Sequence, residues 1–337
     1  LLLGIDIGTY ESKGVLATPQ GEVIAQAAIP HKLLFPHAGW AEHDPELTWW
    51  GDFCTLSKLL LSTDGVSPQD VKGVAVSAIG PDVLPIDENF KPLRMGILYG
   101  IDTRAVVEID ELNAKHGEDV IFNETANSLS SQSTGPKILW LKKNEPEIYK
   151  KARWFVDATT FIVARLTSRV VVDHFSAGAM VPMYDPWKRE WNPKYTKGIL
   201  EIDQLPEILR SHEIAGRITE YASKETGLAV GTPVTTGTID AANYNVGLGV
   251  DVFAALTTGD DNVAVGFGAA GALTTGVRNV FVGEEAGSIG TTTSYSVGIG
   301  RESLKNATGN NNTAVGLCAL RANTTGVNNT AVGLGAL

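Results

Sequence analysis

Residues able to bind a phosphate and its metal ion stand close to the start of the chain. Asp6 lies in the apolar run Gly4-Ile5-Asp6-Ile7 and is followed by Gly8 and Thr9. A carboxylate at the end of a buried strand can hold Mg²⁺, while the exposed amides of a Gly-Thr turn can cradle a phosphate. An aspartate in this position is more often a simple turn former. The strand, turn and strand context favours the phosphate site.

A second acidic stretch follows another apolar run. Asp102 and Arg104 come directly after Ile97-Leu98-Tyr99. Asp102 could accept hydrogen bonds from sugar hydroxyls, and Arg104 could position a carboxylate or another oxygen. The alternative is an ion pair at the surface, and the two residues alone do not decide between these interpretations.

A third acidic residue, Asp240, follows the turn at Gly237 and Thr238. We expect a strand over residues 233–236, then this turn, then an Ala-rich helix with Asp240 at its N-terminus. A helix N-terminus favours an anion and offers free amides to a phosphate. Asp240 could therefore be a helix cap, or the general base that takes a proton from an attacking hydroxyl.

These residues need strands and helices to position them. Apolar runs separated by turns predict a meander of three strands, and helical spacing after Asp44 predicts a helix capped by that residue, with Pro45 at its first position. Glu42 and Asp44 could be catalytic, but a helix cap beside packed aromatic rings is the favoured interpretation. The expected strands are 2–7, 14–18, 22–28 and 71–79, and the expected helices are 45–61, 137–143, 146–152 and 158–166.

Composition limits the class of protein. The 337 residues carry a net charge of -11, with 43% hydrophobic residues, and the length predicts roughly two domains. There is no apolar run of about 18 residues, which argues against a membrane span. The acidic balance argues against a nucleic-acid surface. Cys54 and Cys318 are interpreted as reduced thiols. The chain lacks an initiator Met and stops inside a repeat, so we expect a fragment, or a processed or engineered product.

A break in composition near residue 250 predicts two different domains, 1–250 and 251–337. All prolines, tryptophans and histidines lie before it, and the later part is rich in Gly, Thr and Asn. There the unit Thr-Thr-Gly-x-x-Asn-x-x-Val-Gly recurs at 257–266, 274–283 and 324–333, with Val-Gly about every 17 residues. A short fixed period predicts stacked units, here a β-solenoid or β-roll that forms a homo-oligomer or stacks. A disordered low-complexity tail is the alternative.

Taken in order, the acidic stretches resemble the FGGY family of carbohydrate kinases, most closely the xylulokinase-like members. Gly135-Pro136-Lys137-Ile138-Leu139-Trp140 and Asn144-Glu145-Pro146-Glu147 fall in the order that family shows. The resemblance covers roughly residues 1–250. It implies an α/β fold, the first of two actin-like, ribonuclease H-like domains, and a cytoplasmic location.

The resemblance also implies the chemistry, which is transfer of the γ-phosphoryl group of ATP, with Mg²⁺, to a hydroxyl of a pentulose or a related sugar or polyol. Asp240 would be the catalytic base and Asp6 would lie at the metal. The other residues carried over are Gly8, Thr9, Gly237 and Thr238 at the cofactor, and Asp82, Asp102 and Arg104 at the substrate.

Two departures from the family pattern affect these expectations. Where xylulokinases have Gly-Gln-Met-His-Gly, this chain has Ala78-Ile79-Gly80-Pro81-Asp82, so the sugar stays open. In addition, the repeats stand where the second, nucleotide-binding domain should begin. Because such kinases close two lobes over the nucleotide, we expect little or no turnover from this chain alone.

The repeats resemble segments of phage tail fibres and trimeric adhesin heads, which carry units like 312–316 and 329–333. That resemblance supports an alternative, a structural or adhesive protein at a virion or cell surface with the kinase-like part as a passenger. A chain that joins two unrelated genes fits the abrupt boundary equally well.

Overall fold

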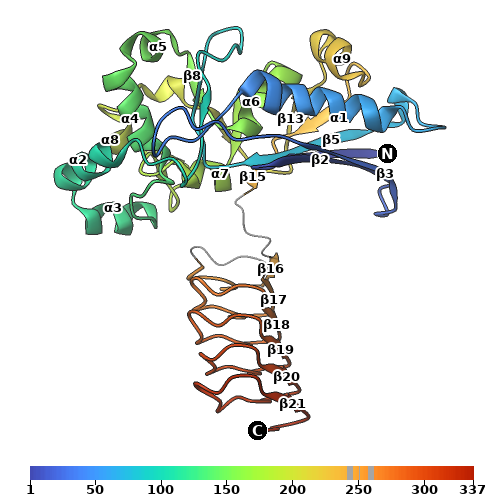
Figure 1. Ribbon diagram of the computed structural model, residues 1–337, viewed down its shortest axis with the longest axis vertical. Helices are drawn as coiled ribbons and strands as arrows, with labels where there is room; N and C mark the ends of the chain where they lie inside the picture. Colours follow the sequence, from blue (N-terminus) through green and yellow to red (C-terminus); the bar gives the residue numbers. More distant parts are fainter. Residues whose placement is uncertain (241–245, 250, 257–261) are drawn as a thin grey trace. The chain divides into compact units, whose positions relative to one another are not determined.

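The computed structural model describes the whole chain except residues 241–245, 250 and 257–261, and describes only the backbone at 240 and 246–248 (Figure 1). The chain divides into two compact units, Leu1–Ala241 and Ala242–Leu337. The second unit therefore begins several residues before the break in composition. Among the described residues, no helix has the length and apolarity needed to span a membrane.

A mixed sheet forms the centre of the first unit. Its strand order is β13-β14-β5-β1-β2-β3, with β15 also pairing with β5. The first three strands are an antiparallel meander, as the sequence predicted, whereas β1, β14 and β15 all run parallel to β5. The strands are β1 (Leu2–Ile7), β2 (Glu11–Ala17), β3 (Val23–Pro30), β5 (Gly73–Ile79), β13 (Ile214–Arg217), β14 (Pro233–Thr235) and β15 (Thr238–Asp240).

The two faces of this sheet differ. In β1, the buried side chains Leu3, Ile5 and Ile7 alternate with less buried ones. They belong to one apolar core with residues of α1 (Asp52–Leu61) and α6 (Ala158–Thr167). Because successive side chains of a strand point to opposite faces, Gly4 and Asp6 lie on the face away from these helices.

The helix predicted after Asp44 is present. Asp44 Oδ1 accepts hydrogen bonds from the amides of Glu46 and Leu47, at 2.9 and 3.0 Å, and Pro45 occupies the first turn. The first segment is a wider π-helical turn, Pro45–Gly51, and α1 then continues to Leu61. A capping carboxylate and a proline at the helix start explain why this boundary could be read from the sequence.

A second, smaller core of the first unit is built around Ile138, Leu141 and Phe155. The remaining helices of this unit contribute to this core, to the larger one or to a small cluster around Val172. The helices are α2 (Val106–His116), α3 (Glu118–Thr125), α4 (Thr134–Asn144), α5 (Pro146–Lys151), α7 (His174–Ala179), α8 (Pro193–Thr196) and α9 (Glu220–Thr226), with 3₁₀ turns at Pro68–Asp70 and Ile202–Gln204. The short strands are β4 (Glu42–His43), β6 (Leu84–Ile86), β7 (Gly96–Ile97), β8 (Trp154–Val156), β9 (Val171–Asp173), β10 (Tyr184–Asp185), β11 (Glu190–Trp191) and β12 (Glu207–Leu209).

One prediction about local structure was wrong. The sequence predicted that Asp240 begins a helix, but residues 238–240 form strand β15, paired in parallel with β5. Hydrogen bonding to β5 takes up this segment, which the local sequence does not reveal. The rest of the expected helix falls partly on residues 241–245, outside the described part of the chain.

The second unit is a ladder of short parallel strands (Figure 1). Each strand pairs with the next one along the chain. The Val-Gly copies at 265–266, 282–283, 315–316 and 332–333 stand at strand ends, whereas the copy at 297–298 begins β19, which ends at Ile299. The middle residue of each strand from 263 onward is buried, as with Ala264 and Phe281. The strands are β16 (Val246–Leu248), β17 (Val263–Val265), β18 (Val280–Val282), β19 (Val297–Ile299), β20 (Thr313–Val315) and β21 (Thr330–Val332).

Candidate functional site

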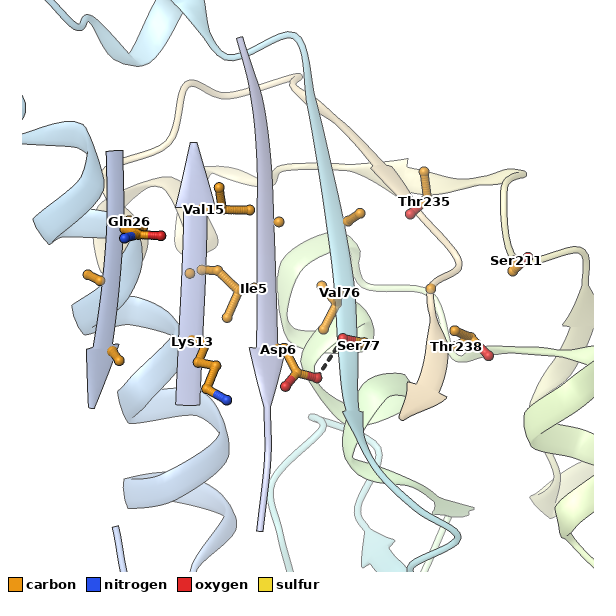
Figure 2. A pocket seen from close by; sticks show the side chains of 16 residues that line it. Ile5, Asp6, Lys13, Val15, Gln26, Val76, Ser77, Ser211, Thr235 and Thr238 are labelled. Atoms are coloured by element: carbon orange, nitrogen blue, oxygen red, sulfur yellow. Dashed lines mark hydrogen bonds between the residues drawn. The ribbon is translucent and has the colours of Figure 1, made fainter. Parts of the chain in front are cut away.

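Three neighbouring parallel strands place polar side chains in one row. Asp6 of β1 is paired with Ser77 of β5, and Thr238 of β15 is paired with the same residue. Ser77 Oγ donates a hydrogen bond of 2.6 Å to Asp6 Oδ1 (Figure 2). Asp6 Oδ2 has no hydrogen-bond partner among the described residues. One oxygen of Asp6 is therefore held in place while the other is available to a ligand.

This row borders a hollow of about 870 Å³ on the sheet face opposite α1. Lys13 and Gln26 line it from β2 and β3, and Gly237 lines it beside Thr238 (Figure 2). Small residues such as Gly4 and Ala75 leave the space open above the backbone. Two predicted cofactor residues, Gly237 and Thr238, and the predicted metal residue Asp6 thus meet at one surface.

The predicted phosphate turn follows directly after β1. The amide of Gly8 donates to Glu11 O at 3.1 Å, and a Cβ atom at Gly8 would lie 2.7 Å from that oxygen. Within the described part of the chain, the amides of Thr9 and Tyr10 donate to no acceptor. Gly8 and Thr9 do not line the hollow but lie past the end of the strand that carries Asp6. A close turn with two free amides suits an anion.

Gly237 permits a close approach between two strands. Its φ is +74°, and a Cβ atom there would lie 2.3 Å from Val76 O and 2.9 Å from Thr159 Cγ2. No side chain fits, so glycine is required both for space and for backbone conformation. The turn lets Thr238 join the row with Asp6.

The predicted base, Asp240, ends strand β15 opposite Ile79 of β5. Its side chain lies outside the described residues. The backbone position is two residues beyond Thr238, at the carboxyl edge of the parallel strands. Ligands of open α/β sheets bind at this edge.

The two residues expected at the sugar, Asp102 and Arg104, bind each other. Arg104 Nη2 donates to Asp102 Oδ2 at 2.7 Å and to Glu42 Oε1 at 2.8 Å, and the Ala41 amide also donates to Asp102. Asp102 is fully buried. The guanidinium carbon lies 4.0 Å from the ring centre of Trp40. The pair is therefore buried, neither at the surface nor open to the hollow. Trp40 packs against the guanidinium, and the Ala41 amide and three nitrogens of Arg104 donate to the Asp102 carboxylate.

The third residue expected at the substrate, Asp82, is also buried. Its Oδ1 accepts a hydrogen bond of 2.9 Å from the Ala158 amide, while Oδ2 is without a partner among the described residues. Burial, together with the charge of Asp157, raises the pKa of Asp82 well above its usual range. Asp157 caps α6 by accepting from the Thr160 amide, and burial raises its pKa to about 6.

Lys137 lies near the carboxylates of both Asp82 and Asp102 and binds the backbone of the segment that carries Asp102. Its Nζ donates to the carbonyls of Leu98 and Tyr99, at 2.5 and 3.1 Å. Burial lowers the pKa of Lys137 to about 7, although Asp102 and Asp82 attract its charge. The sequence analysis cited Lys137 only as part of a family motif. A lysine within an apolar helical run was the signal for its burial.

Sequence reasoning also missed Ser77 and Lys13, because nothing in strands β5 and β2 marks them as neighbours of Asp6. In the described ranges, no three His, Cys, Asp or Glu side chains gather as a metal cluster.

The first unit is similar in sequence to a family of known proteins. Residues 1–247 match the model of the FGGY family of carbohydrate kinases, N-terminal domain. The chain is 31% identical over 251 residues to xylulose kinase of Escherichia coli strain K12, covering 74% of this chain and 50% of that protein. It is 28% identical over 250 residues to xylulose kinase of Bacillus subtilis strain 168, covering 74% and 49%. The chain thus spans about half the length of the curated relatives it matches.

Solved structures agree with this assignment. The crystal structure of xylulose kinase from Rhodospirillum rubrum is similar with a TM-score of 0.67 and 26% identity, over 74% of this chain and 52% of that one. The shared architecture is the actin-like α/β fold of these sugar kinases, as the sequence predicted for the first unit. The family match over residues 1–247, together with this fold, shows that the chain belongs to the FGGY family of carbohydrate kinases.

Proposed function

We propose that the first unit is the sugar-binding lobe of an ATP-dependent kinase that phosphorylates a hydroxyl of a pentulose or a related sugar or polyol. The observation that carries this proposal is the row of Asp6, Ser77 and Thr238 at one hollow, in a chain of this family. A cytoplasmic location belongs to the same proposal. The net charge of -11 does not favour binding to nucleic acid.

The phosphate end of the proposed site fits Mg-ATP. Asp6 Oδ2 offers the hard oxygen that Mg²⁺ prefers, held beside the Ser77 hydroxyl. The amides of Thr9 and Tyr10 can donate to phosphate oxygens, and Gly8 and Gly237 keep the backbone free of side chains there. Thr238 can add a hydroxyl. When bound, Mg-ATP supplies the phosphoryl group and neutralises charge that develops during transfer.

At the sugar end, we propose Asp240 as the general base, which accepts the proton of the attacking hydroxyl. Asp102, Arg104 and Asp82 belong to the walls of this end. Since Asp102 and Arg104 already bind each other, their role in the proposal is to hold the segment after β7 in place. Asp82 lies one short loop beyond β5, the strand whose end is paired with Asp240.

We further propose that this chain alone is an incomplete kinase. It spans about half the length of its relatives, and a kinase of this kind must exclude water from the nucleotide by closing two lobes. Sugar binding needs one lobe only, whereas transfer needs both.

Titration calorimetry of the full chain with Mg-ATP and with a panel of pentuloses and polyols, beside an ATP-turnover assay, tests this proposal. We expect one sugar to bind and no ATP to be consumed. If no sugar of the panel binds, the assignment as a sugar-binding lobe is wrong. If ATP is consumed only when a sugar is present, the incompleteness is wrong.

Two matched variants separate the two ends of the site. Asp6→Asn should weaken Mg-ATP binding about tenfold and leave sugar affinity unchanged, because it removes a metal ligand only. Asp240→Asn should leave Mg-ATP binding unchanged. Where turnover is measured with a second lobe supplied, Asp240→Asn should abolish it; unchanged turnover would show that Asp240 is not the base.

A second candidate role concerns the second unit, which we propose is a β-solenoid that forms a homo-oligomer. Residues that flank the buried middle of each strand face outward, and Ile299 and Val332 are 40% and 70% exposed. Such a row of β-branched side chains suits contact with another copy, as in the tail-fibre or adhesin segments that the repeats resemble. Light scattering of the full chain should then give a multiple of the 35.8 kDa monomer mass. A monomer at high concentration would exclude this role.

A further inference from the structure

Two histidines from separate segments bind the two successive carbonyls of the predicted phosphate turn. His31, just past β3, places Nε2 3.0 Å from Gly8 O. His43, in β4, places Nε2 3.1 Å from Thr9 O. The rings lie edge to face with centres 5.0 Å apart. His43 is fully buried and the His31 side chain is only 8% exposed.

The hydrogen bonds of His43 determine its tautomer. Trp49 Nε1 donates to His43 Nδ1 at 3.1 Å, and an indole nitrogen can only donate. Nδ1 is therefore the unprotonated acceptor, and Nε2 carries the proton donated to Thr9 O. Burial, with the nearby His31 second, lowers the pKa of His43 to about 4, so the ring is neutral near pH 7.

His31 faces an oxygen on each side. Its Nδ1 lies 2.9 Å from Asp52 Oδ2, and its Nε2 faces the carbonyl of Gly8. Ser12 Oγ lies 2.7 Å from the same carboxylate oxygen and donates to it. The two ring nitrogens of His31 thus hold the ring between Gly8 O and Asp52.

These contacts fix the direction of the turn's free amides. In a trans peptide the C=O and the following N–H point in opposite directions. Holding Gly8 O against His31 turns the Thr9 amide away from that ring, and holding Thr9 O against His43 does the same for the Tyr10 amide. Both amides lack acceptors among the described residues. The Thr9 hydroxyl is held separately, 2.9 Å from the hydroxyl of Tyr99.

We propose that His31 and His43 are positioning residues that orient the Gly8–Thr9 and Thr9–Tyr10 peptides toward the terminal phosphates of a nucleoside triphosphate. This inference rests on the proposed function of the turn. It adds that two histidines with little exposure to solvent preorganise the anion site by holding the carbonyls on the opposite side of the turn. An anion bound by the amides gains because no backbone rearrangement is needed on binding.

The test uses the full chain and pairs each disruptive variant with a conservative one. His43→Phe keeps a ring but removes the donor, whereas His43→Gln can return an amide donor near the Nε2 position. His31→Phe and His31→Gln form the second pair. His174→Phe is the matched control, because the only hydrogen bond of that partly buried ring within the described residues is to Tyr184 OH, away from the turn.

Calorimetry with Mg-ATP and with magnesium pyrophosphate gives the first readout. We expect His43→Phe and His31→Phe to weaken binding about tenfold or more, the glutamine variants to recover most of it, and His174→Phe to bind like the wild type. Wild-type affinity in both phenylalanine variants, with unchanged melting temperature, would overturn the proposal.

Nitrogen-15 spectra give a readout that does not depend on ligand binding. We expect His43 as the Nε2–H tautomer, and shifted Thr9 and Tyr10 amide resonances in the phenylalanine variants alone. The Nδ1–H tautomer of His43, or unshifted amide resonances of Thr9 and Tyr10 in the phenylalanine variants, would overturn the positioning role. If these signatures are present but the wild type binds neither phosphate compound, the proposed function fails and the orientation of the turn stands.

Discussion

The two units differ in the sequence separation of the residues that are in contact. In the first, Asp6, Ser77 and Thr238 come from distant parts of the sequence and meet once. In the second, each turn of chain repeats one contact about 17 residues later, as when the Asn279 amide donates to Asn262 Oδ1 at 3.0 Å. A unique site needs long-range contacts between unlike residues, whereas a ladder needs only its nearest neighbour.

The asparagines show how the ladder is held. Asn312 Nδ2 donates to the carbonyls of Gly309 and Gly326, at 3.0 and 2.8 Å, and Asn312 Oδ1 accepts from the Asn329 amide at 3.0 Å. Both the Nδ2 and the Oδ1 atom of this buried side chain thus have hydrogen-bond partners in the same repeat or the next one. The comparison therefore predicts that a disruptive substitution in the first unit destabilises that whole unit. A disruptive substitution in the second unit should destabilise only the neighbouring strands.

The largest expected effect breaks the sheet of the first unit. Gly237→Val would put a Cβ atom 2.3 Å from Val76 O at a φ of +74°, so we expect a loss on the order of 4 kcal/mol in unfolding free energy. Gly231→Ala is the control, since its φ is +87° but no atom lies within 4 Å, and only about 1 kcal/mol should be lost. Chemical denaturation followed by tryptophan fluorescence reports on the first unit only, because all tryptophans precede residue 250. Equal losses in both variants would show that the close contact is unimportant.

The next effect depends on pH and also belongs to the first unit. The pKa of Asp157 is about 6 in the folded chain, above its ordinary 3.8, so the fold binds a proton more tightly than the unfolded chain does. The free energy of unfolding therefore falls as the pH rises from about 4 to about 6, because the carboxylate ionises more easily in the unfolded chain. Asp157→Asn keeps a helix cap and should be more stable than the wild type by about 3 kcal/mol at pH 7.

Denaturation of this variant and the wild type at pH 4, 5, 6 and 7 measures the difference. It should be small at pH 4, where the carboxyl is protonated in the folded chain and only about half ionised in the unfolded chain. A difference that is the same at every pH would mean that Asp157 ionisation is not the cause.

A smaller effect tests the ladder. Asn312→Ala leaves the Gly309 carbonyl and the Asn329 amide without partners, whereas the Gly326 carbonyl keeps the hydrogen bond from Asn323 Nδ2. We therefore expect a loss of about 2 kcal/mol in the second unit alone. Thr325→Ala, at an exposed position with no side-chain hydrogen bond among the described residues, is the control. Hydrogen exchange should show faster opening only in the neighbouring strands. Exchange that increases throughout the first unit would contradict the separation of the two units.

The smallest effect concerns charges on the ladder. Arg301 Nε lies 3.3 Å from Glu284 Oε2, and both side chains are more than half exposed. Arg301→Ala should leave the melting temperature unchanged within error, because solvent screens such pairs. A clear drop would show that ion pairs between neighbouring turns help to hold the ladder.

Local patterns were sufficient for most secondary structure. The meander, the Asp44 cap and the helices after Lys137 and Pro146 were predicted because alternation, capping and proline act within a few residues. Asp240 was misassigned to a helix because its partner strand β5 is far away in sequence. The candidate site residues were named by type, but their neighbours Ser77 and Lys13 could not be.

The sequence by itself determined the acidic residues, the glycines at the turns and the period of the repeats, since each is written in residue type and spacing. Only the tertiary structure decided that Asp102 and Arg104 bind each other, that Asp82 is buried, and that His31 and His43 meet behind one turn. The physical reason is that burial and hydrogen-bond partners depend on which distant segments the sheet brings together.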